Sequence, residues 1–184
     1  MDRDVFILSA ISMTSPAEAM RHSLENIDID LLRLDDAVFG TDGALSPPDI
    51  EQITLEAGLT CPSALVSSSL RAVFFAAQSI LSGDMELVIV IGMGGQAATA
   101  LLLASPDAVG RFNLLPRARL AARSLSGADK AYRSAGIASE DVPIIKNGEN
   151  GILLLKELLE ELEQRQTQWG LVSVDRSALL VERI

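Results

Sequence analysis

Short apolar runs alternate along this chain with stretches in which apolar residues recur every three or four positions, a pattern typical of an α/β protein. Several runs, such as residues 98–104, are apolar at every or nearly every position, as expected of strands that helices cover on both faces. The runs predicted to form strands are residues 5–10, 34–39, 62–66, 86–91, 98–104, 117–123, 142–146, 171–174 and 178–181.

Helix-starting signals lie between these strands. Ser15-Pro16 and Ser46-Pro47 each combine an N-cap with a proline at the first helical position. They predict helices over residues 16–24 and from residue 47 to a stop at Gly58. A further helix is predicted over residues 129–135.

Two other predicted helices differ in how much of their surface is apolar. Residues 67–81 are apolar almost all round, which predicts a helix buried between layers, with Arg71 as one of its few polar interruptions. Residues 151–166, capped by Asn150, carry one apolar stripe, so one face is expected to be buried. Trp169 and Gly170 are expected to end this helix, and residues 175–177 to form a tight turn between the last two strands.

Composition limits the classes of function. A chain of 184 residues that is 48% apolar is expected to form one compact domain or two small, tightly packed halves. Its formal net charge of −10 disfavours binding to nucleic acid or to anionic lipid. The single cysteine, Cys61, forms neither an intramolecular disulfide nor a cysteine-rich metal site, which fits a reducing cytoplasm. The first residues indicate a strand and not a secretory signal.

Residues 87–104 permit two alternatives to a pair of strands. The stretch contains no charge and is long enough to cross a bilayer, although Gly92, Gly94, Gly95 and Gln96 divide it into two β-rich runs. It also contains a strand followed by GxGxxA, which is how a dinucleotide-binding turn begins. No acid follows at the ribose-binding spacing, but Arg117 and Arg119 could instead suit a 2′-phosphate, so a dinucleotide-binding domain stays a remoter alternative.

The segment PSALVSSSLRAVFFAAQSILSGDMELVIVIGMGG, residues 62–95, resembles the nucleophile segment of a thiolase, in which a strand ends at a catalytic cysteine and the following helix runs to a Gly-Asp turn. Other segments resemble thiolase strands in the same order: DVFILSAISMTS, LDDAVFG, GQAATALLLAS, LPRARL and SALLVERI. KNGENGILLLKELLEELEQRQTQWGLVSV resembles the stretch from the GHPxGxSG loop to the strand with the second catalytic cysteine. The resemblance implies a thiolase-like layered α/β fold, with two pseudo-repeated βαβαβ-type halves, residues 1–106 and 107–184, packed as one unit with buried helices between mixed sheets.

The departures from the thiolase pattern fall on the catalytic positions. Val66 takes the place of the nucleophile, Ile145 that of the catalytic histidine and Asp175 that of the second cysteine. Gly148 and Gly151 keep the loop glycines. No loop domain is inserted between residues 95 and 96. Because thiolase chemistry needs a thiolate and groups that move protons, these replacements predict a protein that is inactive as a thiolase.

Residual chemistry has two candidates. Cys61 lies in CPSAL, which resembles the CxSGL of the family, and Ser67 lies at a predicted helix N-terminus, where capping is its simpler role. His22, the one histidine, is expected at the surface. Arg117 and Arg119 lie in an Arg-rich segment that is a candidate site for a coenzyme A phosphate, an acidic carrier protein or an acidic partner subunit.

The resemblance also implies dimerisation through the strand that precedes the nucleophile position, formed here by Pro62, Ser63, Ala64, Leu65 and Val66. An unpaired apolar edge strand would otherwise favour aggregation. We therefore expect a homodimer, or a heterodimer with a thiolase or ketosynthase relative, that acts as a non-catalytic subunit in acyl-CoA or acyl-carrier metabolism. The alternatives are a protein that binds a coenzyme A thioester and a residual acyltransferase. No metal ion is expected to be required.

Overall fold

The computed structural model describes residues 4–25, 27, 34–41, 45–94 and 97–184. Its strands are β1 (Phe6–Met13), β2 (Asp36–Thr41), β3 (Ser63–Val66), β4 (Leu87–Gly94), β5 (Ala97–Ala104), β6 (Ala118–Ser124), β7 (Ile144–Asn147), β8 (Trp169–Val174) and β9 (Ser177–Arg183). Its α-helices are α1 (Pro16–Glu25), α2 (Pro47–Glu56), α3 (Ser69–Ser82), α4 (Pro106–Phe112), α5 (Ala128–Ala135) and α6 (Gly151–Arg165).

The strands form one sheet in the order β3-β2-β4-β5-β1-β6-β9-β8-β7. β1 joins the two halves of this sheet through only two residue pairs, Phe6 with Arg119 and Ile7 with Ala118. Elsewhere the strands pair along most of their length, for example β4 with β5 from Leu87 to Gly94. The sheet therefore consists of two well-paired parts that meet at a short seam.

The two parts repeat one topology. In the first, β2 and β4 are parallel, β4 and β5 antiparallel, and β5 and β1 antiparallel. In the second, β7 and β8, β8 and β9, and β9 and β6 repeat these relations in the same order. The first part adds β3, which pairs parallel to β2 at its edge. The predicted pseudo-repeat of mixed strands is confirmed, while the division at residue 106 stays a prediction.

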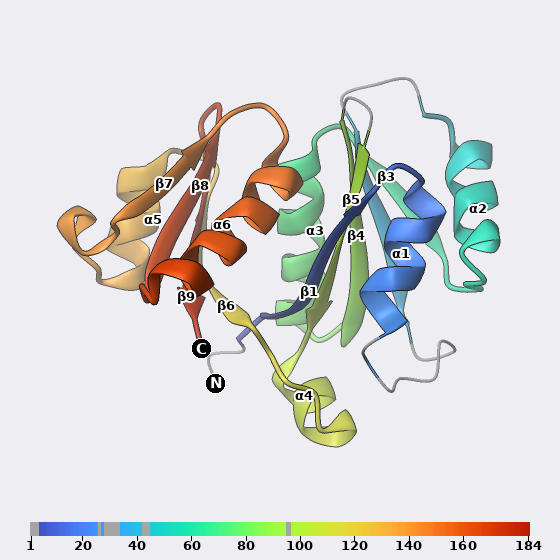
Figure 1. Cartoon of the computed structure of the whole chain (residues 1–184), viewed down its shortest axis with the longest axis horizontal. Helices are drawn as coiled ribbons and strands as arrows, with labels where there is room; N and C mark the ends of the chain where they lie inside the picture. Colours follow the sequence, from blue (N-terminus) through green and yellow to red (C-terminus); the bar gives the residue numbers. More distant parts are fainter. Residues whose placement is uncertain (1–3, 26, 28–33, 42–44, 95–96) are drawn as a thin grey trace.

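The helices form layers around the two sheet parts (Figure 1). α3 and α6 lie between the parts, and their apolar side chains join both of them in one core that includes Leu70, Val73, Leu155 and Leu158. α1 and α2 cover the outer face of the first part, and α5 covers the outer face of the second. The prediction of helices buried between sheets is therefore confirmed.

Three local predictions need correction. The helix α4 was not expected, although Ser105 caps it by accepting a hydrogen bond from the Ala108 N–H and Pro106 follows as its first residue. Residues 62–66 were predicted both as an apolar buried strand and as the dimerisation edge; β3 is an edge strand in which Leu65 is 37% exposed, so burial within this chain is wrong. Trp169 begins β8, and the preceding helix α6 ends at Arg165, where the C-cap residue Gln166 has a positive φ of 56°.

Both alternatives for residues 87–104 are contradicted by the pairing of β4 with β5. The residues that would begin the helix of a dinucleotide-binding turn form instead an antiparallel strand, with Gly94 opposite Ala97. In the described part of the chain, no helix is long and apolar enough to cross a membrane.

Candidate functional site

The N-termini of α3 and α6 meet in the middle layer. The backbone N–H of Gly151 donates a buried hydrogen bond of 2.8 Å to Oγ of Ser69. A Cβ on Gly151 would lie 2.6 Å from Cβ of Leu70, so only glycine allows this approach. Ser68 is the N-cap residue of α3 but makes no side-chain capping bond. Ser69 thus connects α3 to α6, whereas the serines at the start of α3 were expected to cap that helix.

Glycines at the ends of β2 and β4 admit these two helix ends. A Cβ on Gly40 would lie 2.5 Å from Cα of Ser69, and a Cβ on Gly92 would lie 2.8 Å from Cβ of Ile152. A Cβ on Gly94 would overlap the side-chain amide of Asn150, the N-cap of α6. The glycine pattern that resembles a dinucleotide fingerprint therefore serves helix packing.

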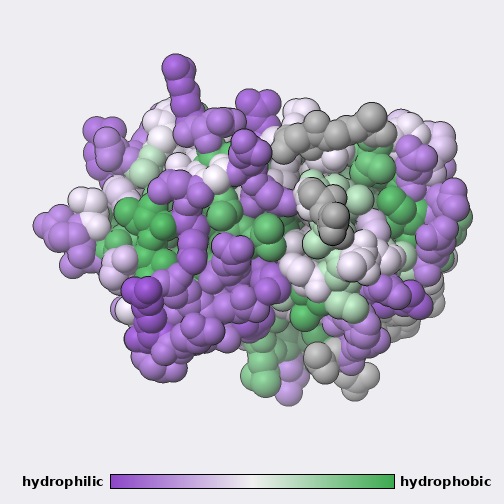
Figure 2. All heavy atoms as spheres, turned by 45° about the horizontal axis from the view of Figure 1, so that its top comes forward, coloured by the Kyte–Doolittle hydropathy of each residue, from purple (hydrophilic) through white to green (hydrophobic). Residues whose placement is uncertain are grey.

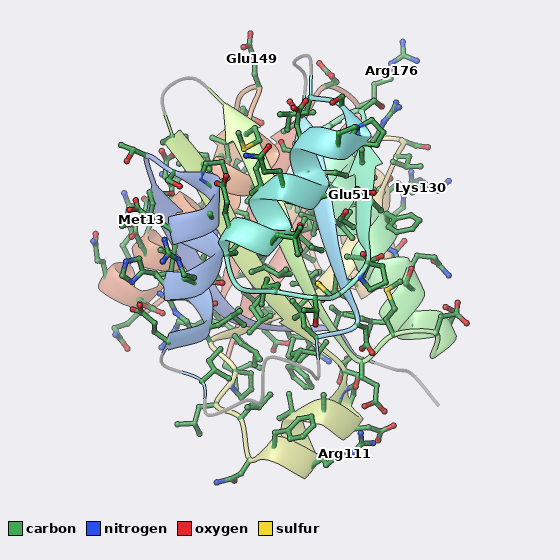
Figure 3. The ribbon with its side chains drawn as sticks, turned by 90° about the vertical axis from the view of Figure 1, so that its right-hand side faces the viewer. Met13, Glu51, Arg111, Lys130, Glu149 and Arg176 are labelled. Atoms are coloured by element: carbon green, nitrogen blue, oxygen red, sulfur yellow. The ribbon has the colours of Figure 1, made fainter. Side chains whose placement is uncertain are left out.

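A hollow of about 700 Å³ opens where these helix ends meet the β8–β9 turn. We call it the helix-end hollow. Its lining residues are Ser67, Ser68, Leu70, Arg71, Leu125, Glu149, Val174, Asp175, Arg176 and Ser177. Figure 2, which brings the top of Figure 1 forward, shows many hydrophilic residues on this side of the molecule. In Figure 3, Glu149 and Arg176 both project from the top of the molecule, at the opposite end from Arg111.

The hollow brings together segments that the thiolase resemblance assigns to the catalytic centre. Asp175 lines it from the β8–β9 turn, with a φ of 53°. Val66 ends β3 directly before Ser67, and its side chain packs against the core between the sheet parts. Ile145 does not line the hollow: its neighbour Ile144 joins the core beside α6, so Ile145 projects from the other face of β7, 49% exposed.

Cys61 lies outside this hollow. It precedes β3, whereas the helix-end hollow opens beyond the other end of that strand, and it lines a separate hollow with Leu55 and Pro62. Burial, followed by the nearby Asp36 carboxylate, raises the pKa of the Cys61 thiol to about 11. A thiol that stays protonated at neutral pH is a poor nucleophile.

Hydroxyl groups in the hollow also lack an activating base. Ser67 is exposed and, in the described chain, makes no side-chain hydrogen bond to Glu149 or Asp175. The one histidine, His22, lies on α1 and contacts Glu25 at 2.5 Å. Nucleophilic catalysis by serine requires a base within hydrogen-bonding reach. The arrangement offers charged and hydrogen-bonding groups to a ligand, and it offers no nucleophile with a paired base.

Arg117 and Arg119 do not form a common site. Arg117 lines one hollow and is paired with Glu163 at 2.8 Å, while Arg119 lines another and is paired with Asp4 and Glu182. The two arginines therefore do not face one common hollow in which a phosphate could contact both of them.

Besides Asp175, the charges at the helix-end hollow come from Arg71, Glu149 and Arg176, which sequence reasoning did not select as site residues. The sequence did contain a signal for Arg71 as a site residue, because it is the one charge within a mostly apolar helix. Arg176 lies in a surface turn, where an arginine carries no such signal. Its role depends on which loops the topology brings to the hollow.

Comparison with known proteins supports the fold. No family model and no curated protein matches the sequence. The crystal structure of human mitochondrial 3-ketoacyl-CoA thiolase in complex with CoA is similar, with a TM-score of 0.86 and 12% sequence identity over 99% of this chain and 98% of that chain. At this identity the similarity shows the fold alone. The predicted thiolase-like fold is confirmed.

Proposed function

We propose that this protein uses the thiolase fold without thiolase chemistry and acts as a non-catalytic interaction subunit in acyl-CoA or acyl-carrier metabolism. One observation carries the proposal. The place of the nucleophile is taken by Val66, and the only thiol of the chain, Cys61, lies at the other end of β3 with a raised pKa. Acyl transfer through a covalent thioester needs a thiolate at the reacting centre.

Assays of acyl transfer test this proposal. Incubation with acetoacetyl-CoA and CoA should give no acetyl-CoA, incubation with acetyl-CoA alone should give no acetoacetyl-CoA, and the intact mass of the protein should not change. A covalent acyl adduct that disappears in Cys61→Ser, or in Ser67→Ala, would refute the non-catalytic role and identify the nucleophile.

The partner surface in this proposal is the free edge of β3. Its sequence, SALV, contains no charge or proline, the features with which natural edge strands avoid unwanted pairing. The other sheet edge, β7, carries Lys146, which pairs with Glu161 at 2.5 Å. Pairing of β3 with a second copy, or with a thiolase or ketosynthase relative, would satisfy its open backbone groups and cover Leu65.

Light scattering at micromolar concentration tests the homodimer. The wild-type protein should be dimeric, and Leu65→Lys should shift it towards the monomer because a charge would lie within the paired edge. Leu115→Lys is a matched control, since Leu115 is 87% exposed and lies outside the strands. A monomeric wild-type protein, with no thiolase or ketosynthase relative recovered from the native host, would refute the interaction role.

The helix-end hollow favours a second candidate function, binding of a coenzyme A thioester. It is about 700 Å³ in volume, within the range of small-molecule sites, and Arg71 and Arg176 supply cations there beside the carboxylates of Glu149 and Asp175. The similar thiolase structure is a complex with CoA. Calorimetric titration with hexanoyl-CoA should show saturable binding that weakens in Arg176→Gln and not in Arg117→Gln. Unchanged affinity in Arg176→Gln would exclude this hollow as the site.

A further inference from the structure

A second hollow lies at the edge of β6, where β1 no longer covers that strand. β1 pairs with Arg119 and Ala118 only, and the hollow follows the rest of β6. It has a volume of about 570 Å³ and lies between α3 and α5, with Ala77 and Ala135 on its walls. We call it the β6-edge hollow. It shares no lining residue with the helix-end hollow.

Arg123 lines the β6-edge hollow and has no acidic partner in the described part of the chain. Its Nη2 donates a 2.5 Å hydrogen bond to the neutral Oε1 of Gln78, and its Nη1 is buried without a hydrogen-bond acceptor. Burial without a nearby carboxylate lowers the pKa of Arg123. Arg111, Arg117 and Arg119, in the same segment, all form ion pairs. Arg123 therefore differs from its neighbours in lacking a counter-charge.

A partly buried guanidinium without an anion is unfavourable, because it loses water and gains no ionic partner in exchange. Its planar fork matches a carboxylate or a phosphate in two parallel hydrogen bonds. Because Nη1 is buried in the present rotamer, an anion in the hollow would be bound by the fork only in a rotamer of Arg123 that presents its Nη atoms to the hollow. An entering anion would favour that rotamer, because Gln78 offers only a neutral acceptor.

We propose that the β6-edge hollow binds the carboxylate or phosphate group of a small anionic ligand through Arg123. The adjacent Arg119 is held by Asp4 and Glu182, so it shapes the wall of the hollow without supplying a free charge. Trp169, on the same wall, offers an aromatic surface to the body of the ligand. This site is independent of the proposed subunit role and of the helix-end hollow.

The protein carries its own probe for this site, because Trp169 is the only tryptophan in the chain. Its fluorescence should be titrated with inorganic phosphate and, separately, with hexanoate, at constant ionic strength so that general screening does not change. We expect a saturable change in Trp169 fluorescence with at least one of the two anions. The anion that binds with the higher affinity identifies the preferred group, phosphate or carboxylate. Arg123→Gln should weaken that binding about tenfold or more, since a charge-assisted hydrogen-bond pair is lost.

Three further variants make the result decisive. Arg133→Gln removes one arginine from an exposed position on α5 outside the hollow and should leave the affinity unchanged. Arg123→Lys keeps the charge without the fork and should bind with intermediate affinity, which also guards against misfolding of Arg123→Gln. Absence of a saturable change in the wild-type protein, or equal affinity in Arg123→Gln, would overturn the proposal. If Arg176→Gln loses binding and Arg123→Gln does not, the anion binds in the helix-end hollow and not in the β6-edge hollow.

Discussion

Asp36 offers a quantitative test of how the first sheet part is packed. This carboxylate lies on β2, is only 6% exposed, and its Oδ1 is buried without a hydrogen-bond partner. Burial is the main cause that raises its pKa from 3.8 to about 6; a hydrogen bond from the Ala37 backbone opposes the shift, and the neighbouring Asp35 adds to it. The folded protein therefore holds the Asp36 proton more tightly than the unfolded chain does.

The sign of the pH effect follows from this difference. Between about pH 4 and pH 6, the folded state binds more protons than the unfolded state, so the free energy of unfolding falls as the pH rises. A pKa difference between 3.8 and about 6 corresponds to about 3 kcal/mol, and solvent screening lowers the effect to about 1–3 kcal/mol. The loss is complete about one pH unit above the folded pKa, near pH 7. Asp36→Asn removes the titration, so the variant should gain about 1–3 kcal/mol over the wild-type protein on going from pH 4 to pH 8.

Urea unfolding at pH 4, 6 and 8, followed by circular dichroism, measures this gain. Asp141→Asn is the control, because it removes the same charge from an exposed carboxylate in the short 3-10 helix Ser139–Asp141. It should change the free energy of unfolding by less than about 0.5 kcal/mol. If Asp36→Asn and Asp141→Asn show the same dependence on pH, burial does not control the ionisation of Asp36 and the reasoning fails.

Two further predictions concern the site and the thiol. Gly40→Ala should lower the free energy of unfolding by about 1–3 kcal/mol, because the added Cβ would meet backbone atoms of Ser68 and Ser69. Gly110→Ala is the control, because nothing lies within 4 Å of the added Cβ, and it should raise the free energy of unfolding by about 0.5–1 kcal/mol. Denaturant unfolding measures both variants, and equal effects would contradict the packing argument. Cys61 should react with iodoacetamide at neutral pH about a hundredfold more slowly in the folded protein than in urea, since its pKa is about 11 and not 9.0. Equal alkylation rates, measured by mass spectrometry, would return Cys61 to the list of nucleophiles.

Local sequence signals were sufficient for most elements of the fold. Ser46 followed by two prolines placed the start of α2, and the apolar runs placed the strands, because caps, prolines and periodicity act within a few residues. The same signal, Ser105-Pro106, was present at α4 and was missed. The edge position of β3 was expected from the thiolase resemblance and not from its composition, since an apolar run is compatible with both a central strand and an edge that pairs with another chain.

The site was less predictable, because its geometry comes from long-range approach of backbone segments. GMGG looked like a dinucleotide fingerprint since glycine has the same sequence signature whether it admits a phosphate or a helix end. In the folded chain, Gly92 and Gly94 admit the start of α6, 56 or more residues later in the sequence. Only the sheet order shows which of the two roles applies.

The packing of glycines against helix ends and strands explains why the shape of the helix-end hollow does not depend on the side chain at the predicted nucleophile position. Gly40, Gly92 and Gly151 fix the distance between helix ends and strands, and each would clash if it carried a Cβ. The charged residues around the hollow are exposed and take no part in this packing. The side chain of Val66, at the position that the thiolase resemblance assigns to the nucleophile, is therefore not needed for this shape, in which two helix N-termini are directed to one place. Under the proposed non-catalytic role, the hollow would bind a ligand without reacting with it, so binding experiments are expected to be more informative than turnover assays.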